Sequence, residues 1–167
     1  MSTSATSHQL ICHFMVEKVF NEGELDLLDL LIAPDAINHE LEIFGPSAVR
    51  GPEAVRQFLR VFRSAFPDLR VTVIDQMGDG ERVVTRWKME GTQKNRLMGI
   101  EASHRFISVE GIRIDRIVGG QIAETWNRWD ALGMLRQLGA MPQLERRPAV
   151  AAPAAAYSAT SSVSAAA

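Results

Sequence analysis

Residues 69–129 form a succession of short segments in which apolar and polar side chains alternate, and this pattern restricts the chain to folds built on a sheet. The expected strands span about 69–77, 81–90, 97–109, 112–118 and 121–129. Asp79-Gly80 and Gly119-Gly120 are typical of the tight turns that join antiparallel neighbours. The sequence therefore predicts a run of antiparallel strands.

Helical patterns precede this run. Apolar residues recur at helical spacing from Ile11 to Val19, and a second short helix is expected at 24–32, ended by Ala33-Pro34-Asp35. A third helix is predicted after Pro52, where apolar side chains form one stripe. Helices followed by antiparallel strands and one short final helix indicate an α+β fold, with helices covering one face of a curved sheet around a cone-shaped pocket.

Residues 36–43 alternate strictly, which predicts a half-buried strand between the helices. Its expected inward residues are Ile37, His39, Leu41 and Ile43. His39 is therefore a candidate catalytic base or acid, because an imidazole titrates near neutral pH. The alternative is a hydrogen-bonded histidine with a structural role.

Composition limits the domain organisation and the class of ligand. From Pro148 onward the chain is almost entirely Ala, Pro, Ser, Thr and Val without charge, so we expect a flexible N-terminus at 1–7, one domain at 8–140 and a disordered tail at 141–167. The net charge of −2 gives no footprint for nucleic acid. One cysteine and four scattered histidines suggest no metal site. Without a signal-like or membrane-spanning run, the expected location is cytoplasmic.

The last expected strand carries polar and aromatic side chains on both faces. Alternation places Ala123, Thr125, Asn127 and Trp129 on one face, which we expect to line the pocket. Glu124 and Trp126 lie on the other face with Ile122. An outer face that also includes Val84 would be an apolar patch on a monomer, so a homodimer through this face is expected.

Five short motifs, taken in order, carry a family resemblance: 51–58, Phe66-Pro-Asp-Leu69, Gly91-Thr92, Leu97-Met-Gly99 and 120–126. With these motifs the chain resembles the SnoaL-like polyketide cyclases of the nuclear-transport-factor-2-like superfamily, over about residues 8–140. The resemblance implies a cone-shaped α+β fold. It also implies an intramolecular aldol ring closure on an apolar small molecule, with neither metal nor organic cofactor.

The chain departs from this family at two site positions. The family's acidic residue follows the final-strand tryptophan, where this chain has Asn127, and the position matching the family's histidine holds Arg113. An asparagine cannot accept a proton from carbon as a carboxylate does. Asn127 and Arg113 can still orient a substrate or stabilise an enolate oxygen.

Other residues are candidates for the same site. Asp130 could replace the missing carboxylate, although its place before an apolar helix favours an N-cap. Trp87 and Trp129 are expected to shape the pocket, with Thr125 beside them. Asp115 is expected either to contact substrate or to neutralise Arg113.

We therefore expect a SnoaL-like cyclase or ester-cyclase-type enzyme that uses acid/base chemistry on a carbonyl or ester compound. Two alternatives remain open from the sequence. One is a protein of the same fold that binds a small molecule, or acts as a scaffold, without catalysis. The other is an epoxide hydrolase or an isomerase, which would use inward carboxylates such as Asp115 or Asp130.

Overall fold

The computed structural model describes residues 3–40 and 50–141. The helical segments, in chain order, are α1 (Thr3–Phe14), the π-helical η1 (Met15–Asn21), the 3₁₀ turn η2 (Leu25–Leu27), α2 (Leu28–Leu31), α3 (Gly51–Ala65) and α4 (Ala131–Leu138). The strands are β1 (Ile32–Asn38), β2 (Arg70–Asp79), β3 (Arg82–Thr92), β4 (Phe106–Val118) and β5 (Gln121–Trp129).

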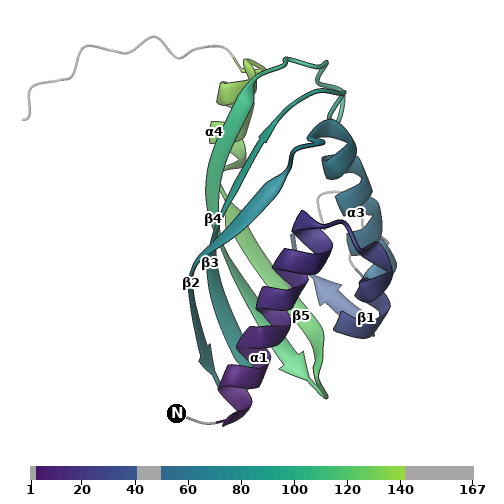
Figure 1. Ribbon diagram of the computed structural model, residues 1–167, viewed down its shortest axis with the longest axis vertical. Helices are drawn as coiled ribbons and strands as arrows, with labels where there is room; N and C mark the ends of the chain where they lie inside the picture. The colour runs from purple at the N-terminus through teal and green to yellow at the C-terminus, as the bar shows by residue number, and fades with distance from the viewer. Residues whose placement is uncertain (1–2, 41–49, 142–167) are drawn as a thin grey trace, which may run out of the picture.

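The strands form one sheet in the order β1-β5-β4-β3-β2. β1 pairs with β5 in parallel, and the other neighbours are antiparallel. The sheet curves around α1 and α3, and α4 lies against it at one end (Figure 1). This is the predicted α+β cone, with helices covering the concave face of the sheet.

The core fills the space between the helices and the concave face. α3 contributes Leu59 and Phe62, which are buried on the stripe that the sequence predicts. α4 adds Met134 and Leu138, which pack in a cluster with residues of β3 and β4. Buried apolar residues of the helices and the sheet thus form two clusters between these layers.

β4 is one long strand where the sequence predicts two. Residues 97–105 lie outside it, and the expected break near residue 111 is absent. Gly111 sits in mid-strand and pairs with Trp87 on one side and Trp129 on the other. The glycine marks a close approach of two tryptophan side chains rather than a turn, because a side chain there would occupy the space that these rings fill.

β1 also differs from its prediction at 36–43, because it starts at Ile32 and includes Pro34 and Asp35. Among the strands β1 pairs with β5 alone, and Ile37 makes one isolated antiparallel bridge to Arg50. β1 is thus an edge strand, where Pro34 need not donate a hydrogen bond to a neighbouring strand. The strand ends at Asn38. Residues 41–43 of the prediction fall outside the described residues.

A bulge in β5 changes which side chains face the core. Ile117 pairs with Ile122 and Arg116 pairs with Glu124, so Ala123 is the extra residue. Ile122 is therefore buried in the core, and the prediction that it shares the outer face with Glu124 is wrong. Beyond the bulge the predicted alternation holds.

The predicted domain limits remain predictions. α1 begins at Thr3, before the expected boundary at residue 8, and the expected tail from 142 onward falls outside the described residues. In the part of the chain that the structure describes, no helix is long and apolar enough to cross a membrane.

The packing at Gly111 predicts a stability defect. The added methyl of Gly111→Ala would lie 2.7 Å from Trp129 Cβ and 2.8 Å from Trp87 Cε2. We expect a loss of about 1–3 kcal/mol in the free energy of unfolding, measured by denaturant titration. Gly91→Ala is the matched control, because its methyl would meet nothing closer than Phe66 Cβ at 3.3 Å. Equal losses in the two variants would contradict this account.

Candidate active site

A cavity of about 60 Å³ lies between the helices and the concave face of the sheet. That volume is several times the space that one water molecule requires on the same measure. Its apolar wall comprises Met15, Val16, Phe20, Val55, Phe58, Phe62, Val71, Trp87, Met89 and Trp129. Its polar lining consists of Cys12, Asn38, Glu40, Thr85, Arg113, Asp115 and Asn127.

Arg113 and Asp115 form an ion pair at the wall of this cavity. Arg113 Nε donates to Asp115 Oδ1 at 2.8 Å and to Oδ2 at 2.7 Å. Thr125 Oγ1 donates to Asp115 Oδ1 at 2.6 Å and accepts from Arg113 Nη2 at 3.3 Å. The sheet register creates this cluster, since Asp115 lies opposite Thr125 and Arg113 lies opposite Asn127 on the next strand.

The ion pair keeps a charged arginine inside the fold. Burial of the guanidinium opposes its charge, but the charge and hydrogen bonds of Asp115 outweigh that effect and raise the pKa of Arg113 above its usual value. Arg113 Nη1 makes no hydrogen bond to any residue that the structure describes. This N–H group is therefore a donor available to a ligand in the cavity.

A second polar group centres on Glu40, just beyond the end of β1. Glu40 Oε2 accepts from Asn127 Nδ2 at 2.8 Å, and Glu40 Oε1 accepts from Trp129 Nε1 at 2.6 Å. Asn127 Oδ1 in turn accepts from Trp87 Nε1 at 3.1 Å. The Trp129 indole and the Asn127 amide thus hold a carboxylate at the cavity wall, and the Trp87 indole holds the amide.

Five of the predicted site residues meet at this cavity: Trp87, Arg113, Asp115, Asn127 and Trp129. Thr125 is buried behind the wall and contacts it through Asp115 and Arg113. Asp115 pairs with Arg113, as one of the two sequence interpretations holds.

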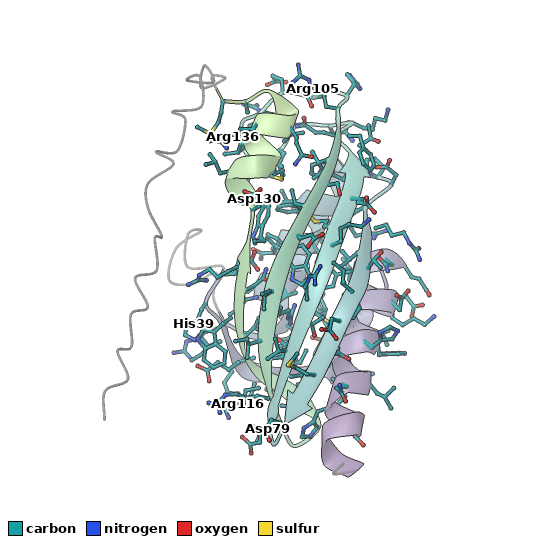
Figure 2. All side chains as sticks on the ribbon, turned by 90° about the vertical axis from the view of Figure 1, so that its left-hand side faces the viewer. His39, Asp79, Arg105, Arg116, Asp130 and Arg136 are labelled. Carbon is teal, nitrogen blue, oxygen red and sulfur yellow. The ribbon has the colours of Figure 1, made fainter. Side chains whose placement is uncertain are left out.

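His39 lies outside the cavity, so the prediction that it faces inward is wrong. Its Nε2 is 3.0 Å from Glu124 Oε1, and its ring stacks on Trp126 with centroids 5.1 Å apart. Figure 2 shows His39 at the edge of the sheet, away from Asp130. The inner face of β1 carries Ile32 and Ala36, so the same alternation directs Asn38 and Glu40 inward.

Glu40 is the functional candidate that sequence reasoning missed. The sequence carries no signal for it, because in the structure the small Ala36 is buried whereas the larger Ile37 is only half-buried. Size and hydrophobicity favoured the wrong face of an edge strand, because such a strand contacts the core along only part of its length.

Asp130 acts as a helix cap. Its Oδ1 accepts from the Gly133 backbone N–H at 2.7 Å at the start of α4. The N-cap interpretation is confirmed, and Asp130 does not line the cavity. Within residues 3–40 and 50–141, no group of His, Cys, Asp or Glu side chains is arranged to hold a metal ion.

Comparison with known proteins agrees with this fold. The model of the SnoaL-like polyketide cyclase family matches residues 11–138. The chain therefore belongs to the SnoaL-like polyketide cyclase family.

Two curated relatives are similar over most of their length. Aklanonic acid methyl ester cyclase DauD of Streptomyces strain C5 is 31% identical over 131 residues, which cover 75% of this chain and 77% of the relative. Nogalonic acid methyl ester cyclase of Streptomyces nogalater is 31% identical over 121 residues, which cover 72% of this chain and 89% of the relative. Among solved structures, TsrD from Streptomyces laurentii superposes with a TM-score of 0.73 at 32% identity, covering 84% of this chain and 99% of TsrD.

Cys12 provides a chemical test of how closed the cavity wall is. Burial raises the pKa of the Cys12 thiol, and the neighbouring Asp115 carboxylate raises it further. Because the thiolate is the reactive form, the native protein should not react with a disulfide reagent such as DTNB at mildly alkaline pH. After unfolding in guanidinium chloride, one thiol per chain should react. Equally fast reaction before and after unfolding would contradict the described burial.

Proposed function

We propose that the protein closes a ring in a small carbonyl or ester compound by an intramolecular aldol addition inside this cavity. The observation that carries the proposal is the convergence of a free Arg113 N–H and the Asn127 amide on a cavity whose lining is mainly apolar. An apolar lining suits the hydrophobic body of a substrate, while a few fixed polar groups orient its oxygens. Membership of the SnoaL-like family supports the same reaction class.

The reaction needs one proton acceptor and one group that stabilises a developing negative charge. A carbon next to a carbonyl loses its proton, and the resulting enolate carbon attacks a second carbonyl of the same molecule. The new alkoxide then takes a proton, so product and substrate are isomers. Arg113 lines the cavity and is placed to donate from Nη1 to the enolate oxygen, where a fixed donor stabilises the developing negative charge.

The direct test uses aklanonic acid methyl ester and nogalonic acid methyl ester, the compounds in the names of the two relatives. Each should convert to a product of unchanged mass with one additional ring, detected by chromatography and NMR. Tight binding of both esters without conversion would overturn the proposal in favour of a binding protein. Formation of a diol from an epoxide, or a shifted double bond, would assign one of the other two reaction classes.

Separating activity from stability requires two variants of the ion pair. Arg113→Gln leaves Asp115 buried without its cation, which should cost about 3–5 kcal/mol in the free energy of unfolding. Arg113→Gln/Asp115→Asn removes both charges and should recover most of that stability. Both variants should lose about 10²–10³-fold in kcat, because neither has the guanidinium. Full activity in the stable double variant would rule out the role of Arg113.

We also propose that two copies pair through the outer face of the sheet. Val84, Ile114 and Trp126 lie side by side across β3, β4 and β5, and Ile112 beside them is 51% exposed. This apolar row supports pairing because burying it would remove it from water. Sedimentation should show a dimer, and Ile112→Lys should shift the population to monomer. A wild-type chain that stays monomeric at all accessible concentrations would contradict this.

A further inference from the structure

Among the described residues that line the cavity, three have side chains able to take up a proton, and two of these are unsuited to it. Asp115 is 1% exposed, and its oxygens already accept from Arg113 and Thr125. With both oxygens held by these donors, Asp115 is already committed to its ion pair with Arg113. Cys12 is buried with its sulfur 3.7 Å from Asp115, which disfavours a thiolate. The third side chain is Glu40.

We propose that Glu40 is the catalytic base of this cavity, the group that takes the proton from the substrate carbon. This inference rests on the proposed ring closure and names the residue that begins it. The hydrogen-bond donors to Glu40 are the neutral Asn127 amide and Trp129 indole. Within the described residues Glu40 has no salt-bridge partner. Each oxygen accepts one hydrogen bond from these donors, so lone pairs remain for a proton.

Asn127 is a positioning residue for this base. An indole N–H only donates, so the contact with Trp87 fixes the amide with Oδ1 toward Trp87 and Nδ2 toward Glu40. The amide can therefore donate to Glu40 without competing for the substrate proton. A carboxylate at position 127 would face Glu40 across the same 2.8 Å contact, where two negative charges disfavour each other. Asparagine at 127 and glutamate at 40 thus form one consistent pair.

The charges balance through the reaction. The electron pair of the broken C–H bond passes into the enolate, and the proton goes to a Glu40 oxygen. Negative charge thereby moves from Glu40 to an oxygen that Arg113 can bind. In the free protein, the charge of Glu40 already contributes to the raised pKa of Arg113. When the enolate carbon has attacked the second carbonyl, protonated Glu40 returns its proton to the alkoxide, so no outside reagent is consumed.

The first test is Glu40→Gln, which keeps the shape of the side chain and removes the base. It should lower kcat for the methyl ester probes by about 10²-fold or more, with KM changed only a few-fold. Glu110→Gln is the matched control, because Glu110 is an exposed carboxylate on the outer face of β4. His39→Ala should also keep its activity. A folded Glu40→Gln enzyme within about threefold of wild type would overturn the proposal.

An exchange of the two side chains gives a result that a purely structural role would not produce. Glu40→Gln/Asn127→Asp moves the carboxylate to the other side of the same hydrogen bond. The double variant should recover about tenfold or more of the kcat lost in Glu40→Gln, since a base again faces the cavity. The midpoint of thermal unfolding is measured for each variant, and an unchanged midpoint assigns the change in kcat to catalysis rather than to folding.

A labelling experiment separates failure of this inference from failure of the proposed function, because it needs no turnover. Phenacyl bromide alkylates a carboxylate when an oxygen displaces bromide from its CH₂ group, giving an ester that peptide mass spectrometry locates. In a Cys12→Ala background, which removes the cavity thiol, the label should appear on Glu40 and be absent from the same protein carrying Glu40→Gln. Labelling confined to surface carboxylates would overturn the assignment. Labelled Glu40 in a protein that cyclises neither ester would leave the base in place and reject only the ring closure.

Discussion

The cavity depends on the mutual neutralisation of Arg113 and Asp115 inside the sheet. An isolated charge at either position would cost several kcal/mol, which is a large part of the stability of a domain of this size. The cost is offset because β4 supplies both charges two residues apart on one face, and Thr125 on β5 donates a further hydrogen bond to Asp115 Oδ1. With the pair in place, the concave face can combine a fixed positive donor with walls that are otherwise mainly apolar.

The sequence predicts the fold well because the fold rests on local signals that extend over many residues. The strand alternation, the turn glycines and the stripe of α3 all appear in the structure. The exceptions are places where a contact distant in sequence overrides the local pattern. Gly111 resembles a turn residue but lies in mid-strand, because Trp87 and Trp129 need the space above it. Uninterrupted alternation would place Ile122 on the outer face, but the bulge at Ala123 shifts the phase of the strand and Ile122 is buried in the core.

The candidate site could be predicted in part. β3, β4 and β5 pair in the interior of the sheet, so alternation alone brings Trp87, Arg113 and Asn127 to one face. The residues of β1 could not be assigned in this way. That strand is short, has only β5 as a neighbouring strand and presents Ile37 and Ala36 to opposite faces, so its orientation depends on the helices packed against it. His39 was favoured for this reason, and Glu40 was missed.

The bulge in β5 also affects how family members should be compared. It lets Ile122 anchor the strand in the core, while Asn127 and Trp129, in the opposite phase of the pleat, still reach the cavity. If positions are counted from Gln121 as though β5 alternated without interruption, cavity residues are exchanged for surface residues. Counting from Trp126 keeps the correct phase. For this chain, the phase of β5 at the site can be assigned only after the extra residue at Ala123 has been located.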